Sequence, residues 1–129
     1  RALTCPGGGA QNRRSPDPQL ESARMIHVVA VITAQPGQRA KVLEAFLANT
    51  AAVRAEQGCI EYTATIDAEG LPPTPGSIGE DSFIVVEKWA SLAALQAHGA
   101  APHMKAYGAK VKDLVAKRVI HILQPVQAG

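Results

Sequence analysis

The chain has few of the features that mark membrane, secreted or disulfide-rich proteins. Its 129 residues include two cysteines, and a bridge between Cys5 and Cys59 would only tether a segment without regular structure. No apolar run approaches the roughly 18 to 20 residues of a membrane helix, and the first residues lack the apolar core of a signal peptide. We therefore expect two free thiols and a cytoplasmic protein without a membrane partner.

An excess of charge of one sign is also missing from the part of the chain that is expected to fold. Four of the 13 basic and two of the 11 acidic residues lie within residues 1–24, which leaves nine of each sign in the remainder. Binding to a phosphate backbone needs a basic stripe, and a neutral domain does not supply one. We expect no nucleic-acid partner.

Composition divides the chain into an N-terminal arm and one domain. Residues 1–24 combine three consecutive glycines with three prolines and show no periodic apolar face. This composition is typical of a flexible tail. Residues 25–129 are enough for one hydrophobic core and too few for two, so they are expected to form a single domain.

Apolar spacing from Met25 onward predicts both strands and helices. β-Branched runs or strict alternation predict strands at 25–33, 59–67, 82–89 and 117–126. Apolar residues three or four positions apart predict helices at 35–58, 92–99 and 102–116. The order β-α-β-β-α-α-β indicates an α+β, ferredoxin-like split βαβ fold with a four-stranded antiparallel sheet and helices on one face.

Two of the predicted strands, 25–33 and 117–126, are apolar on both faces. Helices would cover one face of the sheet only, so the other face needs a partner. We expect two sheets to pack together in a homodimer. In the strand 59–67, alternation places Ile60 and Tyr62 on the same face.

The connection 68–81 contains three prolines and three glycines. It is longer than a tight hairpin needs, and long connections in compact domains tend to be lids, partner contacts or disordered segments. The sequence leaves its role open.

Aromatic residues make up only 4% of the chain and there are four histidines, yet four of these aromatic and imidazole side chains gather in one stretch. "EKWASLAALQAHGAAPHMKAY" (87–107) holds the one tryptophan, two of the four histidines and one of the two tyrosines. His98 would end one short helix and His103 would begin the next, so the break lets both imidazoles point into a common volume. Phe83, Glu87 and Trp89 share one face of the preceding strand. If that face looks toward the helices, these side chains and Tyr107 on the second helix would complete a small-molecule pocket.

Each of these side chains also has a purely structural interpretation. Trp89 alone is more often a core residue, and His98 can simply place a cation at the negative end of its helix. His103, near a helix start, gains nothing from the dipole, which favours a functional or hydrogen-bonded core role. If Glu87 faces inward, we expect it to pair with a basic side chain.

Metal and nucleotide chemistry fit the sequence poorly. The spacing from His98 to His103 spans a helix break, unlike a metal-binding pair one turn apart, and no cluster of cysteines or carboxylates adds ligands. "CPGGGAQ" and "TPGSIG" lack the strand, glycine spacing and lysine of phosphate-binding loops, and there is no G-x-S-x-G elbow. We expect no metal and no cofactor.

Three segments resemble a known family. "IHVVAVITAQPGQ", "AEQGCIEY" and above all "FIVVEKWASLAALQAHGAAPHMKAY" are similar to the antibiotic biosynthesis monooxygenase superfamily, the dimeric αβ-barrel group that includes quinol monooxygenases. The third segment matches the pattern of E-x-W, a short helix ending in His, and a second His after a small-residue break. The resemblance covers about Met25 to Val126.

The resemblance implies a homodimer in which each protomer holds a cavity between sheet and helices. It implies oxidation of a phenolic, quinol or polyketide-like small molecule by O2 without flavin, haem or metal. An electron-rich phenolate can reduce oxygen itself, so the protein needs to supply a base and a dry pocket. On this resemblance His98 and His103 are the acid/base candidates, Trp89 and Tyr62 line the pocket, and Tyr107 donates a hydrogen bond to the substrate.

Other functions stay open on the sequence alone. The chain could be a dimeric small-molecule-binding module without turnover, or a superfamily isomerase acting on a phosphorylated ketone. A haem-binding variant is a further alternative, although the haem-degrading members need an asparagine on the first strand and "HVVAVIT" has none.

Overall fold

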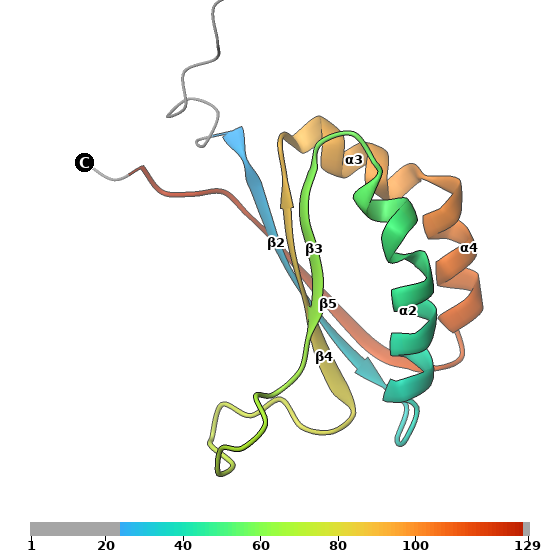
Figure 1. The fold of residues 1–129 in the computed structure, drawn as a ribbon, viewed down its shortest axis with the longest axis vertical. Helices are drawn as coiled ribbons and strands as arrows, with labels where there is room; N and C mark the ends of the chain where they lie inside the picture. The colour runs from blue at the N-terminus through green and yellow to red at the C-terminus, as the bar shows by residue number, and fades with distance from the viewer. Residues whose placement is uncertain (1–23, 128–129) are drawn as a thin grey trace, which may run out of the picture.

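A computed structural model describes residues 24–127, so the predicted arm lies outside the described residues except for Arg24. The elements follow the predicted order, as Figure 1 shows. They are β2 (Ile26–Ala34), α2 (Arg39–Arg54), β3 (Cys59–Thr65), β4 (Ser82–Trp89), α3 (Leu92–Ala100), α4 (Pro102–Val111) and β5 (Val115–Leu123).

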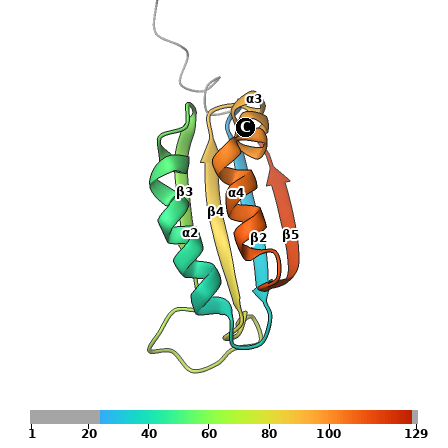
Figure 2. The same cartoon turned by 90° about the vertical axis from the view of Figure 1, so that its right-hand side faces the viewer.

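The strands form one four-stranded sheet in the order β3-β4-β2-β5, and all neighbours are antiparallel. All three helices lie on the same face of this sheet, which Figure 2 shows from the helix side. The architecture confirms the predicted ferredoxin-like fold. None of the helices in the described part of the chain has the length and apolar character needed to span a bilayer.

Period-two alternation in β2 decides which residues enter the core. Val28, Ala30 and Ile32 are buried beneath the helices, while the residues between them are half-buried on the opposite side. Helix α2 meets this face with Val42, Phe46 and Val53, which recur at helical spacing and are buried. The core therefore lies between the sheet and the helices.

The structure corrects the predicted boundary between the last helix and the last strand. Leu114 and Val115 continue the apolar spacing of α4, which is why the sequence predicts a helix to residue 116. Instead α4 ends at Val111, and Val115 pairs with Ala34 at the end of β2. If the helix continued to residue 116, Val115 could not pair with β2, and the backbone groups at the end of β2 would lack a partner on that side.

The prediction for Ile60 is also wrong. The pairing of β3 with β4 shifts between Cys59 and Glu61, so one extra residue is accommodated in β3. Ile60 is 52% exposed, while Cys59 packs against the core and Tyr62 is buried. The irregular pairing resets the alternation at the start of the strand.

The sheet face away from the helices, which we call the open face, carries an apolar centre. It consists of Val29 and Val31 from β2, Ile84 and Val86 from β4, and Val119 from β5, which pair across the strands. β5 lies at the sheet edge, and Ile120 and Ile122 on its helix side are 50% and 57% exposed. In the single chain, β5 is therefore apolar and exposed on both faces.

Candidate functional site

His98 lies at the end of α3 with its ring against the sheet. The Ser91 hydroxyl caps the helix by accepting the N–H of Ala94 at 3.1 Å. The last turn then places the imidazole 4.6 Å from the Trp89 ring and 5.6 Å from the Tyr62 ring, measured between ring centroids. His98 is buried, so this contact is part of the interior.

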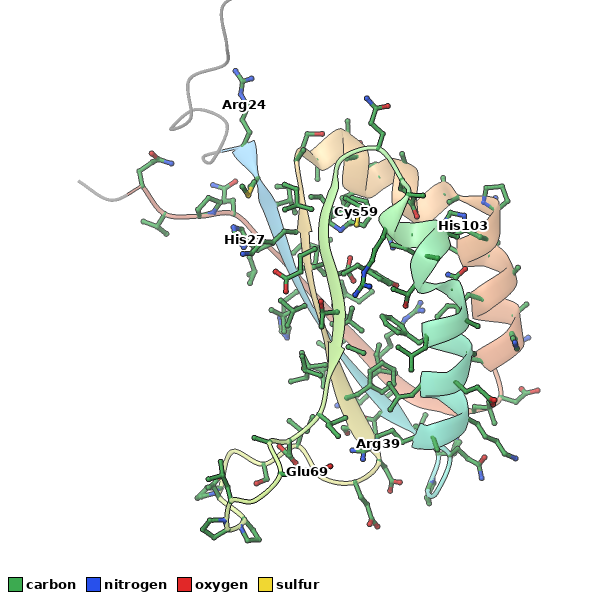
Figure 3. The ribbon with its side chains drawn as sticks, in the orientation of Figure 1. Arg24, His27, Arg39, Cys59, Glu69 and His103 are labelled. Atoms are coloured by element: carbon green, nitrogen blue, oxygen red, sulfur yellow. The ribbon has the colours of Figure 1, made fainter. Side chains whose placement is uncertain are left out.

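A single residue joins the helices that carry the two histidines. Ala101 has an extended backbone, with φ −66° and ψ 139°, and serves both as the end of α3 and as the N-terminal cap of α4. Pro102 then opens α4, where its fixed φ and missing N–H are tolerated. His103 follows in the first turn, on the helix side of the sheet (Figure 3).

The two imidazoles converge on one carboxylate that the sequence analysis did not identify. Glu56 Oε2 lies 2.9 Å from His98 Nδ1 and 2.7 Å from His103 Nε2. Glu56 comes from the turn after α2, 42 and 47 positions away in the chain. One sequence signal points to it, since an acidic residue just past the negative end of a helix is electrostatically unfavourable without a partner.

Gly58 lets this turn approach α3 closely. Its φ is +86°, a conformation that favours glycine, and an added Cβ would lie 2.6 Å from the Ala94 Cβ. A side chain at this position would therefore push the turn away from α3 and displace Glu56 from the histidines.

Glu87 is buried beside the histidine, but its partner is not the basic residue that we expected. Its Oε1 accepts a hydrogen bond of 2.9 Å from Trp89 Nε1, and the indole is fully buried. Burial raises the pKa of the Glu87 carboxyl, and the Trp89 hydrogen bond and the nearby His98 oppose this rise. The site thus holds a desolvated carboxyl with a neutral hydrogen-bond donor.

The remaining predicted pocket residues meet around Phe46. Its ring stacks on Tyr62 at 5.0 Å and makes edge contacts with Phe83 at 6.0 Å and Tyr107 at 6.2 Å. Burial raises the pKa of both tyrosines, and for Tyr107 a nearby Arg118 opposes the rise. Tyr62 contacts both His98 and Phe46, so it links the two groups of residues.

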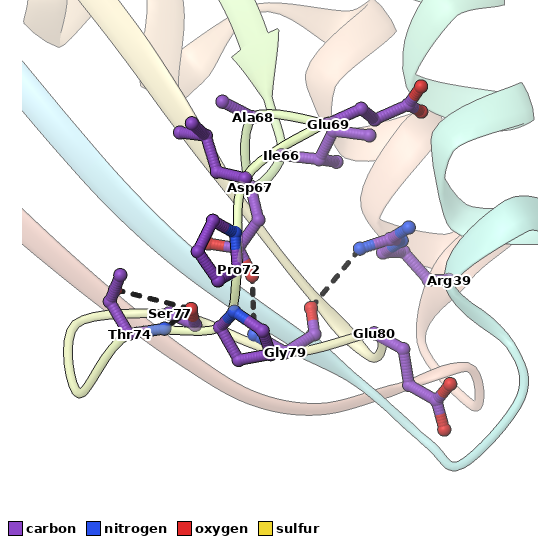
Figure 4. Close-up of a pocket in the computed structure, with 12 residues that line it drawn as sticks. Arg39, Ile66, Asp67, Ala68, Glu69, Pro72, Thr74, Ser77, Gly79 and Glu80 are labelled. Carbon is purple, nitrogen blue, oxygen red and sulfur yellow. Dashed lines mark hydrogen bonds between the residues drawn. The ribbon is translucent and has the colours of Figure 1, made fainter.

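These side chains pack against one another between the sheet and the helices. A more open hollow of about 470 Å³ lies at the other end of the sheet, beside the connection after β3 (Figure 4). Asp67 anchors that connection by accepting the N–H groups of Ile78 and Gly79, which lowers its pKa. Arg39 donates to the Gly79 carbonyl, so the hollow has a defined wall without any of the predicted site residues.

The arrangement of the histidines suits proton transfer better than metal binding. Both imidazoles direct a nitrogen to a carboxylate oxygen, and aromatic rings shield His98 from water. Within residues 24–127, no group of three or more His, Cys, Asp or Glu side chains is arranged to hold a metal ion. An imidazole with a carboxylate partner is a common acid/base unit in enzymes.

Comparison with known proteins identifies the family. The model of the family described as "Antibiotic biosynthesis monooxygenase" matches residues 25–110. The chain belongs to this family. The chain is also 41% identical over 104 residues to "Probable quinol monooxygenase YgiN" of Escherichia coli strain K12, and the match covers 78% of this chain and 98% of that protein.

Solved structures agree with the antibiotic biosynthesis monooxygenase fold. A Caulobacter crescentus CB15 protein is 32% identical, with a TM-score of 0.67, over 84% of this chain and 95% of that chain. PA3566 from Pseudomonas aeruginosa is 24% identical, with a TM-score of 0.68, over 82% and 98%. The family and fold expected from the sequence are therefore confirmed.

Proposed function

We propose that this protein is a monooxygenase that oxidises a quinol or another phenolic small molecule with O2 and needs no cofactor. The observation that carries the proposal is the contact of the His98 ring with Trp89 and Tyr62, with one ring nitrogen held by a carboxylate. This places a base at the edge of an aromatic-lined, water-poor interior. The name of the YgiN relative supports a quinol as the substrate class.

The proposed reaction begins with transfer of a phenolic proton to an imidazole nitrogen. The resulting anion supplies electrons to O2, and a C–O bond forms on the aromatic ring. The O–O bond then breaks, so one oxygen atom stays on the ring as a carbonyl and the other leaves as water. A quinol is thereby converted to a hydroxylated quinone, and the ring is the only reductant required.

Oxygen consumption by the purified protein with a panel of hydroquinones and naphthoquinols tests this proposal. We expect uptake that His98→Ala reduces by at least about a hundredfold, the lower range for loss of an acid/base group. His121→Ala is the matched control, because this imidazole lies on the open face, on the opposite side of the sheet from His98. A His98→Ala protein as active as the parent would refute the assigned role.

If no compound of the panel causes oxygen uptake, two further measurements distinguish the alternative functions. Saturable binding of a quinol without oxygen uptake would indicate a binding module instead of an enzyme. A Soret band after addition of haem would favour the haem-binding variant.

We also propose that a second copy of the chain covers the open face, giving the homodimer expected from the sequence. Support comes from the apolar centre of that face and from the exposed Val119 and Leu123 on β5. Sedimentation velocity at micromolar concentration should give twice the chain mass, and Val31→Asp should give a monomer because it places a charge in that centre. A monomeric parent protein would overturn this proposal.

A further inference from the structure

We infer that Glu56 is a positioning residue that fixes the protonated nitrogen of each histidine and thereby makes His98 Nε2 the base of the site. This inference rests on the proposed function, in which an imidazole accepts the phenolic proton. It assigns different roles to two histidines that the sequence could not distinguish.

The hydrogen bonds themselves determine the tautomers. An ionised carboxylate only accepts hydrogen bonds, so each ring nitrogen that faces Glu56 Oε2 must carry a proton. His98 therefore carries its proton on Nδ1 and His103 on Nε2. In the neutral rings, the free lone pairs are left on His98 Nε2 and His103 Nδ1.

The surroundings of the two rings then separate their roles. Side-chain exposure rises from 8% for His98 through 13% for Glu56 to 29% for His103. His98 contacts the indole and phenol rings of the site, whereas His103 reaches this group through its bond to Glu56. His98 thus receives the proton, and His103 holds the carboxylate in place from the solvent side.

The negative charge of Glu56 interacts with the imidazoles and is not paired with the neighbouring arginine. The neighbouring Arg54 directs both Nε and Nη2 to the Tyr62 carbonyl oxygen, at 3.2 and 2.8 Å. Among the described residues, the only ion-pair partners of Glu56 are His98 and His103. When His98 Nε2 takes up a proton, the imidazolium forms 2.9 Å from this carboxylate and is stabilised by it.

The tautomers are directly measurable on the unmodified protein. Long-range ¹H–¹⁵N correlation spectra at alkaline pH, where imidazoles are neutral, distinguish a protonated Nδ1 from a protonated Nε2. We expect Nδ1–H for His98 and Nε2–H for His103. A His98 ring that carries its proton on Nε2 would overturn the inference whether or not the protein oxidises quinols, so this readout is independent of the proposed function.

Variants test whether Glu56 sets these states. Glu56→Ala should release His98 from the Nδ1–H tautomer, while the matched control Glu61→Gln, which changes an exposed carboxylate on the open face, should leave it in place. Unchanged His98 spectra in a folded Glu56→Ala protein would refute the role. If that variant does not fold, the tautomers measured on the parent protein still test the inference.

Kinetics test the division of roles between the histidines. Glu56→Gln keeps the side-chain length but not the charge, and it should lower kcat by at least about tenfold with little change in KM. In a Glu56→Ala background, His103→Ala should cause no further loss, because His103 acts through Glu56. Additive losses from the two substitutions would show that His103 contributes separately.

Discussion

The two faces of the sheet are made from the same strands, and they organise polar groups in opposite ways. On the helix side, Glu87 is buried and bonded to Trp89 at 2.9 Å. On the open face, Glu61 and Lys88 form a pair at 3.6 Å with side chains about two-fifths exposed. Alternation along a strand therefore separates residues that build a site from residues available for association.

The difference shows on which face a polar group has the larger effect on the free energy of unfolding. A buried polar atom without a partner is costly, so the helix side tolerates polar groups only in defined hydrogen bonds. Water competes for the pair on the open face, and its contribution is small. Substitutions on the two faces can test this contrast quantitatively.

The largest effect is expected from Trp89→Ala. The substitution removes a fully buried indole and the donor to Glu87, and buried Trp→Ala changes typically cost about 3–5 kcal/mol of unfolding free energy. When both substitutions are measured in the Val31→Asp monomer, Val86→Ala on the open face should cost about 1 kcal/mol or less, because Val86 is only half-buried in the single chain. Urea denaturation measures both. Similar losses for the two variants would contradict the contrast between the faces.

Gly58→Ala should show how closely the turn with Glu56 must pack on α3. The substitution strains a positive φ and also brings a Cβ to 2.6 Å from Ala94, so we expect a loss of about 2–3 kcal/mol. Gly70→Ala is a matched control, since its φ of +85° is nearly the same and nothing lies within 4 Å of the added carbon. Thermal unfolding should place Gly70→Ala nearer the parent protein; equal losses would indicate that backbone strain alone matters.

The buried Glu87 predicts a pH-dependent effect. Because burial raises the folded-state pKa above the unfolded value, this carboxyl favours the folded state at acid pH, and that contribution is lost as pH rises through the folded-state pKa. Glu87→Gln removes the titration and keeps an oxygen that can accept from Trp89. In urea titrations at a series of pH values, the variant should therefore gain stability relative to the parent as pH rises through the folded-state pKa of Glu87. A pH-independent difference would argue against the desolvated carboxyl.

The smallest effect is expected from Glu61→Gln. Exposed ion pairs contribute about 0–1 kcal/mol, so the urea midpoint should hardly change, and added salt should reduce any difference further. A loss above about 2 kcal/mol would show that the open face is more desolvated than the single chain indicates, as it would be beneath a partner.

Local pattern was sufficient to predict most of the fold. The β-branched, apolar run of residues 25–33 and the helical spacing around Phe46 are both strong physical signals, and both elements form. The end of α4 could not be predicted, because Leu114 and Val115 satisfy helical spacing and only pairing with β2 makes Val115 a strand residue. Ile60 was misplaced for a related reason, since a register shift depends on the partner strand.

The candidate site was predictable where its residues lie close together in sequence. Trp89 and His98 are nine positions apart, and the structure brings their rings into contact. Glu56 could not be placed in the same way, since its approach to His98 depends on the packing of the α2–β3 turn against α3.

The single extended residue between α3 and α4 restricts the insertions and deletions that this segment can accept. Ala101 fixes the angular phase between the two helices, and each residue added within a helix would rotate the rest of that helix by about 100°. An insertion or deletion between His98 and His103 would therefore turn His103 away from Glu56, even if every side chain were kept. Relatives that use this carboxylate are expected to differ here in side-chain type but not in length.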